Sequence, residues 1–542
     1  MFVPVSRTRK GEINRIFTSI GYSLLLHFKH QKMKEDILSK LTQKLTLPKI
    51  LILAFLLRFI AVIFAQGFGY HDDHFLIIEA SQSWVDGHDY NHWLPWNQED
   101  PKPEGHSFFY VGVHFCFFWI MDALANFSPA VKMFIIRLLH ALMSLLVVYF
   151  SYTITLRISD KKNAINVGFL MAVFWIFPWL SVRNLVEMFC IPFLLGATHL
   201  LYKQENKPSP GLLIWAGFIA GLAFSCRFQT GFYILGLGIS TLFIYRIKST
   251  IYFSIGVIFS ILLIQGGIDL IIWKRPFAEM TEYILYNLAN KYSYGTGAWY
   301  TYVSLLTGLL FLPLGLIYWY GFYKASSRKS MFVWLPTLLF LIFHSFYPNK
   351  QERFIFTIIP MFILLGQTGL YLANQENKKS FRRFLDISLC IFLILNTLLL
   401  PLTLTYYGKK ARVESMKYLS KYENINYLMT ENTNASSGKM PPLFYLKQWP
   451  GVYEVDNTRS CDSLSYNWKE NPNFQPSFVL FEGDKNLKNR IDTVKKQFPL
   501  LEYEATFVPG FVDRMLYTLN PMNANETIYI YRNKQRIAKK KN

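Results

Sequence analysis

The chain has 542 residues, of which 52% are hydrophobic, 17% aromatic and only 17% charged, with a formal net charge of +21. Soluble domains carry about a quarter of charged residues, so this composition excludes an ordinary soluble enzyme and indicates an all-α membrane protein with many spans. In such a protein the excess of Lys and Arg belongs to cytoplasmic loops, so the positive charge does not indicate a nucleic-acid partner.

Residues 1–49 form a basic segment, with ten Lys or Arg against three acids. The apolar piece 16–28 within it is too short to span a bilayer and lacks a small-residue cleavage site, which argues against a signal peptide. We expect an interfacial amphipathic helix there; the alternative is that translation begins at Met33. The excess of positive charge predicts that this segment is cytoplasmic.

The apolar runs between residues 50 and 405 predict a transmembrane domain with about eleven crossings. The predicted crossings are 50–66, 131–156, 164–182, 186–202, 211–227, 230–245, 251–272, 299–323, 331–347, 354–373 and 384–404. A further apolar run, 109–125, is predicted to be re-entrant or interfacial, because a crossing there would move the basic loop 157–162 to the outer side. With this assignment the other basic loops fall inside, and the chain ends outside.

The predicted outer loop 67–108 holds eight acids and one Lys. It begins just after the first crossing and contains HDDH (71–74). Four further polar clusters fall on the same face: RNLVE (183–187), CRFQT (226–230), YGTGAWYTY (294–302) and NKQERF (349–354). Ionisable residues near membrane depth are costly and tend to mark function. We therefore expect the five clusters to form one site.

The residues alone leave three interpretations of HDDH open. His71 or His74 could bind a metal ion together with Asp72 and Asp73, although no second cluster of ligand spacing is evident in the sequence. The four residues could instead form a solvated turn. In the third interpretation, a carboxylate acts as a general base that takes the proton from an acceptor hydroxyl.

A reaction of that kind needs cations to stabilise its leaving group. Lys350, Arg353 and Arg227 lie at the predicted outer ends of crossings. The planar fork of Arg matches phosphate, and Lys supplies a point charge. The sequence has no glycine-rich nucleotide-binding motif, so a lipid-linked phosphosugar is favoured over a nucleotide sugar as the donor.

After residue 405 the composition changes to that of a soluble domain. A helix is predicted over 411–422 and another near 484–497, with strands over 425–432, 476–483 and 526–532. This alternation predicts a small extracytoplasmic α/β domain over residues 406–542. Its sequence shows no phosphate loop or nucleophile motif of its own.

The ordered clusters resemble the motifs of glycosyltransferase family 22. These enzymes are α-mannosyltransferases of GPI-anchor and N-glycan precursor assembly that use polyprenyl- or dolichyl-phosphate-mannose and have the GT-C fold. The resemblance covers roughly residues 50–375. The matching residues are His71, Asp73, Phe75, Glu79, Asn184, Glu187, Arg227, Tyr294, Gly295, Thr296, Trp299, Tyr302, Lys350, Arg353 and Phe354. The sequence departs from the family motifs at Asp72, His74 and Asn349, where the family has proline, glutamate and histidine.

The resemblance implies an integral-membrane, inverting glycosyltransferase with a GT-C-like transmembrane catalytic domain over residues 50–405. It implies that Asp73 is the catalytic base, with Asp72, His71, His74 and Glu79 beside it. Donor phosphate binding is implied for Lys350, Arg353 and Arg227, and substrate binding for Asn184, Glu187, Tyr294, Trp299 and Tyr302. The transferred hexose would be mannose, passed from a polyprenyl-phosphate donor to a lipid-linked or surface glycan.

The expected partners are therefore a polyprenyl-phosphate sugar, a glycan or glycolipid acceptor and the lipid bilayer. No cofactor or bound metal is expected, and a divalent cation stays an alternative. The short chain and compact C-terminal domain resemble bacterial members, which implies an inner-membrane protein with its site facing the periplasm; in a eukaryote the site would face the lumen of the endoplasmic reticulum. Alternative functions are transfer of another sugar, a protein acceptor, or a transporter or flippase for lipid-linked saccharides. A transporter would favour inverted repeats, which are not evident in the sequence.

Overall fold

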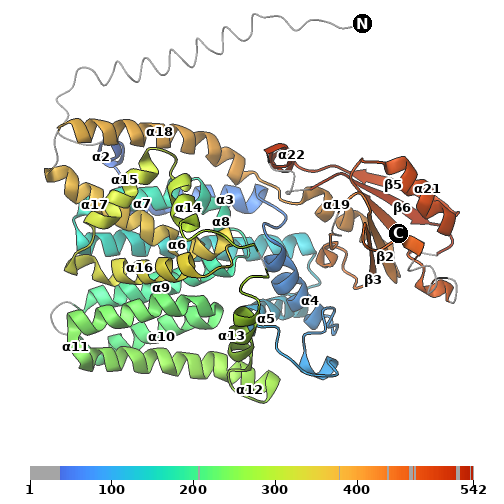
Figure 1. Ribbon diagram of the computed structural model, residues 1–542, viewed down its shortest axis with the longest axis horizontal. Coiled ribbons are helices and arrows are strands. Elements are labelled where there is room, and N and C mark those ends of the chain that lie inside the picture. Colours follow the sequence, from blue (N-terminus) through green and yellow to red (C-terminus); the bar gives the residue numbers. More distant parts are fainter. Residues whose placement is uncertain are drawn as a thin grey trace, which may run out of the picture.

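The computed structural model describes residues 37–204, 208–293, 295–376, 379–435, 439–462, 468, 471–519, 525–536 and 539–540. Most of them form a helical bundle, and a smaller sheet domain projects from one end of it (Figure 1). The predicted interfacial helix 16–28 and the predicted site residue Tyr294 lie outside the described residues.

The bundle is built from helices joined by short connections. The α-helices are α2 (Ile37–Thr42), α3 (Leu47–Phe64), α4 (Ala80–Val85), α5 (Phe108–Leu124), α6 (Pro129–Ile158), α7 (Lys161–Val173), α8 (Ile176–Leu180), α9 (Val186–Lys203), α10 (Pro210–Cys226), α11 (Gly231–Ile261), α12 (Gly267–Trp273), α13 (Ala278–Ala289), α14 (Thr301–Leu309), α15 (Leu314–Lys324), α16 (Met331–Phe346), α17 (Ile359–Glu376) and α18 (Lys379–Leu404). Short π- and 3₁₀-helical segments are η1 (Asp73–Glu79), η2 (Pro95–Asn97), η3 (Phe228–Thr230), η4 (Leu262–Gly266), η5 (Arg328–Ser330) and η6 (Glu352–Ile358).

Among the described residues, six helices are long and apolar enough to cross a membrane. They are Leu47–Phe64, Pro129–Ile158, Phe228–Trp273, Arg328–Phe346, Glu352–Asn374 and Ser380–Leu404. Phe228–Trp273 contains two of the predicted crossings, 230–245 and 251–272, and Arg246 between them has a non-helical backbone with φ of 67°. The predicted crossing 299–323 is a bent pair, α14 and α15, whose axes differ by 111°. The six long helices confirm a membrane protein.

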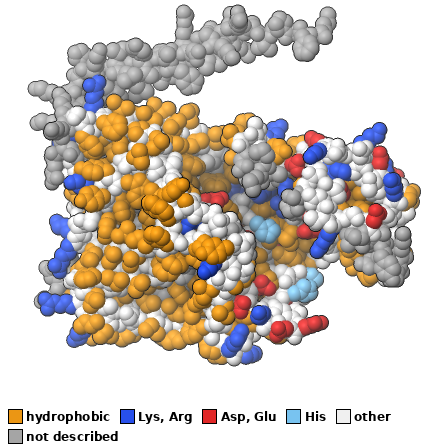
Figure 2. Space-filling model, in the orientation of Figure 1, with side chains coloured by type: hydrophobic (Ala, Val, Ile, Leu, Met, Phe, Trp, Pro, Cys, Tyr) orange, Lys and Arg blue, Asp and Glu red, His pale blue; other side chains and the backbone are white. Residues whose placement is uncertain are grey.

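Burial separates the central helices from the outer ones. In Glu352–Asn374, which includes most of α17, 89% of the most apolar 18-residue window is buried, against 28% in α3 and in α18. A helix that is apolar on all sides and buried belongs to the core, whereas the exposed apolar faces of α3 and α18 match a lipid environment. Figure 2 shows hydrophobic side chains over most of the bundle surface and charged side chains over the sheet domain.

The sheet domain has five main strands in the order β3-β2-β4-β6-β5. Its elements are α19 (Lys410–Leu419), β1 (Tyr422–Glu423), β2 (Tyr427–Asn432), η7 (Leu443–Tyr445), β3 (Gly451–Asp456), η8 (Pro472–Phe474), β4 (Phe478–Glu482), α21 (Leu487–Gln497), β5 (Leu501–Phe507), α22 (Phe511–Leu519), β6 (Ile528–Asn533) and β7 (Lys539–Lys540). Strand β2 pairs in parallel with β3 and β4, and β6 pairs antiparallel with β4 and β5. The predicted α/β alternation is confirmed, with β3 and β5 added.

The segments that leave α3 and α18 run side by side where the bundle meets the sheet domain. Gly67 and Gly408 form a parallel bridge, and the Gly408 N–H donates to the carbonyl oxygen of Gln66 at 3.0 Å. Gly67 has φ of +71°, and a Cβ there would lie 1.9 Å from the Gly408 oxygen, so glycine is required. The buried Arg183 donates to the carbonyl oxygens of Gln66 at 2.9 Å and Tyr406 at 2.7 Å. Arg183 therefore links both segments through hydrogen bonds to their backbones.

Candidate active site

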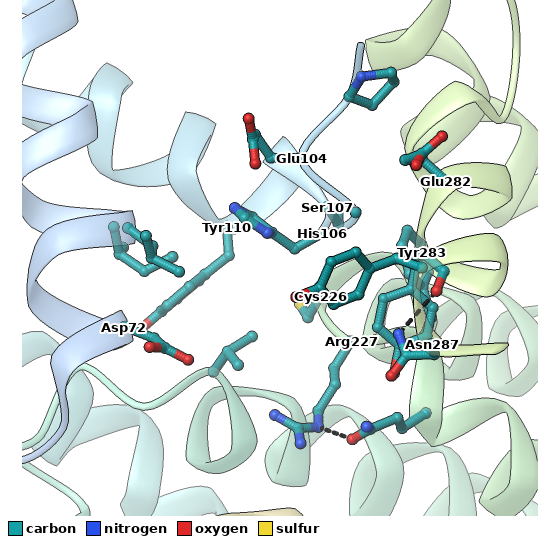
Figure 3. Close-up of a pocket in the computed structure, with 18 of the residues that line it drawn as sticks. Asp72, Glu104, His106, Ser107, Tyr110, Cys226, Arg227, Glu282, Tyr283 and Asn287 are labelled. Atoms are coloured by element: carbon teal, nitrogen blue, oxygen red, sulfur yellow. Dashed lines mark hydrogen bonds between the residues drawn. The ribbon is translucent and has the colours of Figure 1, made fainter. Parts of the chain in front are cut away.

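A cavity of about 630 Å³ brings four of the five predicted polar clusters together. Its lining includes Asp72 and Asp73 from HDDH, Val186, Arg227, and Arg353. The fifth cluster reaches its edge through a backbone bridge between Thr296 and the lining residue Asn349. Figure 3 shows Asp72 and Tyr110 on one side of the cavity, Tyr283 and Asn287 on the other, and Arg227 at one end. The predicted convergence of these clusters is therefore seen in the structure.

Asp73 begins η1 and lines the cavity although its side chain is only 5% exposed. Its Oδ2 atom is buried and accepts no hydrogen bond from the described residues. The Asn184 side-chain amide donates to the Asp73 carbonyl oxygen at 3.4 Å, and Asn184 Oδ1 is 2.8 Å from His114 Nε2. Asn184, a predicted substrate-binding residue, thus holds the backbone of the predicted base.

Burial raises the pKa of Asp73 well above its usual range, and the Glu187 carboxylate raises it further. Arg353 and Arg227 act in the opposite direction. The raised pKa makes the Asp73 carboxylate a stronger base than a solvated aspartate, and its free Oδ2 is a place for a proton. These are the properties that a general base needs.

Two arginines and two carboxylates form an ion-pair network beside Asp73. Arg353 donates to Asp72, and Arg227 donates to Glu187. Arg353 Nε also lies 3.9 Å from Glu187 Oε1. Both guanidinium groups pack around the ring of Phe354, at 5.4 Å for Arg227 and 5.8 Å for Arg353. The cavity therefore presents two forked cations next to a carboxylate with an open acceptor atom.

Two glutamines orient these arginines. Arg353 Nε donates to Gln351 Oε1 at 2.9 Å, and Arg227 Nε donates to Gln229 Oε1 at 2.8 Å. In both cases the partner is two residues away in the chain, so the local backbone fixes the guanidinium plane. A second nitrogen of each guanidinium group donates to a carboxylate, Asp72 for Arg353 and Glu187 for Arg227.

The end of the cavity away from Arg227 carries groups that the sequence did not point to. Figure 3 shows Glu104 and Glu282 there, with His106 between them and Asp72. Burial raises the pKa of Glu104, and the neighbouring Glu282 raises it further. Burial lowers the pKa of His106 to about 4, so this imidazole is neutral near pH 7. A neutral imidazole beside two carboxyl groups is suited to binding sugar hydroxyls.

Lys350, predicted to bind donor phosphate, lies just beyond the end of α16. Its Nζ donates to the carbonyl oxygens of His344 at 2.6 Å, Ser345 at 2.9 Å and Tyr347, and it sits 5.2 Å from the centre of the Tyr302 ring. It is not among the described residues that line the cavity. In this structure Lys350 satisfies the free carbonyl groups at a helix terminus.

Two of the predicted aromatic residues also lie outside the cavity lining. Tyr302 is buried, and its hydroxyl donates to the Gln351 carbonyl oxygen at 3.1 Å, which positions the segment leading to Arg353. Trp299 is 60% exposed on the surface. The hydroxyl group of Tyr302 therefore binds the protein backbone.

His74 and Glu79 form a buried pair with 3.1 Å between Nε2 and Oε1. Glu79 Oε1 also accepts a hydrogen bond from the backbone N–H of Phe444 in the sheet domain, at 3.1 Å. Neither residue lines the cavity. Through the bond to Phe444, the pair joins η1 to η7.

His71 is exposed and packs against Phe75 with 4.4 Å between ring centres. Within the described residues, no group of three His, Cys, Asp or Glu side chains is placed to hold a metal ion.

Comparison with known proteins decides the family. The model of the Alg9-like mannosyltransferase family matches residues 49–444. The chain belongs to the Alg9-like mannosyltransferase family. It is therefore a membrane glycosyltransferase, and the transporter alternative is set aside.

Relatives and solved structures agree with this assignment. A GPI mannosyltransferase 3 of Debaryomyces hansenii is 22% identical over 417 residues, which are 73% of this chain and 72% of the relative. The Dol-P-Man:Man(7)GlcNAc(2)-PP-Dol alpha-1,6-mannosyltransferase of Saccharomyces cerevisiae is 24% identical over 45% of this chain and 47% of the relative.

ArnT of Cupriavidus metallidurans, solved bound to undecaprenyl phosphate, has a TM-score of 0.57 at 13% identity, over 89% of this chain and 97% of ArnT. The oligosaccharyltransferase of Archaeoglobus fulgidus in its apo form has a TM-score of 0.51 at 11% identity, over 86% of this chain and 74% of that one. The fold is GT-C.

Proposed function

We propose that this chain transfers mannose from a polyprenyl-phosphate-mannose donor to a glycan or glycolipid acceptor, with inversion at the anomeric carbon. The observation that carries the proposal is the cavity in which Asp73, with its open Oδ2 atom, lies beside Arg353 and Arg227. One carboxylate base and two phosphate-matching cations are what a single-displacement sugar transfer requires. The names of the yeast relatives support mannose as the sugar.

In the proposed reaction the Asp73 carboxylate takes the proton from an acceptor hydroxyl. The hydroxyl oxygen attacks the anomeric carbon of the donor sugar from the face opposite the phosphate, and the new glycosidic bond forms as the bond to the phosphate oxygen breaks. Polyprenyl phosphate leaves with that electron pair. Asp73 keeps the proton, which passes to solvent before the next cycle. A positioned base contributes about 10²–10⁴ in rate.

Arg353 and Arg227 would hold the phosphate of the donor. In the structure each arginine is paired with a carboxylate, Asp72 or Glu187, so phosphate binding involves an exchange of partners. The Asp72 side chain is 38% exposed, whereas Glu187 is fully buried, so Asp72 is the partner that can move away. Arg353 is therefore the primary phosphate ligand in the proposal, with Arg227 as its second cation. The solved ArnT complex with undecaprenyl phosphate supports a lipid phosphate as the ligand for this fold.

The proposed topology has eleven crossings, with the cavity and the sheet domain on the extracytoplasmic side. It is supported by the distribution of charge: Figure 2 shows Lys and Arg side chains along the edge of the bundle that is farthest from the sheet domain. The positive-inside rule assigns that edge to the cytoplasm. The corresponding location is the bacterial inner membrane with a periplasmic site, or the endoplasmic reticulum membrane with a luminal site in a eukaryote. The proposed domains are 1–49, 50–405 and 406–542.

Reconstitution of the purified chain with radiolabelled polyprenyl-phosphate-mannose and a native lipid extract tests the function. Label should move into a lipid-extractable or glycan product, and the Asp73→Asn variant should give none. Radiolabelled nucleotide sugar without any lipid carrier is the matched control. Transfer from that nucleotide sugar alone would overturn the donor assignment.

A further inference from the structure

A second group of cations lies outside the cavity, at the junction of the bundle with the sheet domain. It consists of Lys409 and Arg412 at the start of α19, and Lys439. Lys409 Nζ is 6.0 Å and Arg412 Cζ is 5.4 Å from the centre of the same ring, that of Phe68. Arg412 also lies 5.9 Å from the ring of Phe75. Figure 2 shows Lys or Arg and His side chains in the hollow between the bundle and the sheet domain.

Two of these three cations form no ion pair within the described residues. Within the described residues, neither Lys409 nor Arg412 forms an ion pair; Arg412 donates to the Met440 carbonyl oxygen, and its Nε is buried without a partner. Lys439 Nζ is buried without a hydrogen bond and forms long ion pairs with Glu482 at 3.9 Å and with Glu526 at 4.0 Å. Burial and the positive charge of Arg412 lower the pKa of Lys409 to about 8. Glu482 acts on Arg412, and Asp513 acts on Lys409, at longer range than an ion pair. A buried cation without a direct anionic partner is unfavourable unless an anion joins it.

The group lies close to the proposed base but on another side of its helix. His71, two residues before Asp73, packs against Phe75, which Arg412 also contacts. Side chains two positions apart point to different faces of a helix. Asp73 therefore faces the cavity, while His71 faces the junction cations, and Asp72 lies between the two and lines the cavity.

We propose that Lys409, Arg412 and Lys439 bind a phosphate group carried by the acceptor glycolipid. This inference rests on the proposed function. The donor has its phosphate on the anomeric carbon, so that phosphate must lie inside the cavity at Arg353 and Arg227. One phosphate cannot also occupy the junction, so an anion bound there belongs to the other substrate. An acceptor anchored at the junction would pass His71 and Asp72 to place its hydroxyl at Asp73.

Lys409→Gln tests the site in the full-length chain, with Lys410→Gln as a control of the same charge change one residue away. The acceptor is the anionic glycolipid fraction of a native membrane extract, separated by ion exchange and varied at saturating polyprenyl-phosphate-mannose. Lys409→Gln should raise the KM for this fraction roughly tenfold, the loss of about one charge-assisted contact. The kcat and the donor KM should stay within about twofold of the parent enzyme, because the cavity arginines are unchanged. Equal acceptor KM values in the two variants, or a change in donor KM alone, would overturn the inference.

The phosphate bound at the junction could come from the acceptor or from a phospholipid headgroup of the membrane. Assays in nanodiscs of different lipid composition distinguish these two sources. The difference between the parent enzyme and Lys409→Gln should persist in pure phosphatidylcholine nanodiscs. Loss of that difference when phosphatidylglycerol is left out would assign the site to bulk lipid and overturn the acceptor role.

Binding of radiolabelled pyrophosphate, measured by equilibrium dialysis, is independent of transfer. In an Arg353→Ala background, which weakens the cavity site, adding Lys409→Gln should weaken pyrophosphate binding roughly tenfold, and adding Lys410→Gln should not. If the parent enzyme transfers mannose but these affinities are equal, the junction site is wrong while the proposed function stands. If the affinities differ but no lipid-phosphate sugar is used, the proposed function fails and the junction is an anion site without that role.

Discussion

Arg353 donates a hydrogen bond to Asp72, although 281 residues separate them in the chain. Asp72 directly precedes the proposed base, so this ion pair links the proposed phosphate ligand to the proposed general base through adjacent residues. Occupation of Arg353 by a phosphate would therefore change the electrostatic environment of Asp73. Three predictions test this arrangement, and two further ones test the junction with the sheet domain and the topology.

Asp73→Asn should abolish mannose transfer while donor binding stays close to that of the parent enzyme. Asn keeps the shape and one acceptor oxygen but cannot take a proton, so the expected loss in kcat is at least about 10²–10⁴-fold. Single-turnover kinetics with labelled donor measure the loss, and equilibrium binding of undecaprenyl phosphate measures the retained site. Asp72→Asn is the matched control and should keep measurable transfer. An inactive Asp72→Asn with an active Asp73→Asn would exchange the two roles.

Asp72→Asn should move the acidic limb of the pH profile of kcat/KM to lower pH. The negative charge of Asp72 raises the pKa of Asp73, and the charge of Arg353 lowers it. The substitution removes the first effect and leaves Arg353 less neutralised, so both changes favour the ionised base. Activity, which requires ionised Asp73, should then appear at lower pH. Glu99→Gln, an exposed change in the same predicted outer loop, should leave the limb in place. A shift to higher pH would contradict the assignment.

Arg353→Ala should raise the donor KM strongly, and Arg353→Lys should restore only part of the loss because Lys lacks the forked geometry. Loss of a charge-assisted hydrogen bond costs about 1.5–3 kcal/mol. Lys350→Met should behave differently, because its Nζ binds carbonyl oxygens at the end of α16. It should lower the unfolding temperature clearly and change the donor KM little. Donor titrations and thermal unfolding of the same preparations compare the two effects. A large donor effect of Lys350→Met with unchanged stability would place this ammonium at the donor after all.

Glu79→Ala should destabilise the junction of the bundle with the sheet domain. The substitution leaves the buried His74 ring and the Phe444 N–H without their shared acceptor, at a cost of about 1–3 kcal/mol. Thermal unfolding in detergent measures the loss, with Glu99→Ala as the exposed control. Cleavage by protease between residues 405 and 410 should become faster in Glu79→Ala. Unchanged unfolding and cleavage would show that the pair does not secure the junction.

The predicted topology has its own test. Reporter fusions or cysteine labelling at positions 85, 327 and 450 should place 85 and 450 on one side of the membrane and 327 on the other. Labelling of the unfused full-length chain controls for effects of truncation. If 85 and 450 lie on opposite sides, α5 crosses the membrane and the eleven-crossing assignment is wrong.

Sequence patterns predicted the convergence at the site better than its individual contacts. The charge rule placed HDDH and NKQERF on one face, which is why Asp72 and Arg353 could be expected near one another. It could not show that Glu187 would pair with Arg227, because that depends on how α9 and η3 pack. The contacts of Lys350 could not be predicted for a related reason: its reach to the last carbonyl groups of α16 is visible only once the helix end is located. Glu104 and Glu282 belong to segments without a recognisable motif, so only folding brings them to one end of the cavity.

The close approach of Gly67 and Gly408, held by Arg183, affects how enzymes of this family could be recombined. The last crossing ends near residue 404, and that is where a designer would first divide the chain into exchangeable parts. The backbone just beyond it, however, contacts the start of the loop that carries Asp73 and has no room for a side chain at Gly67. A chimaera should therefore be joined after Gly408, so that both glycines and the backbone oxygens that Arg183 binds come from the same parent.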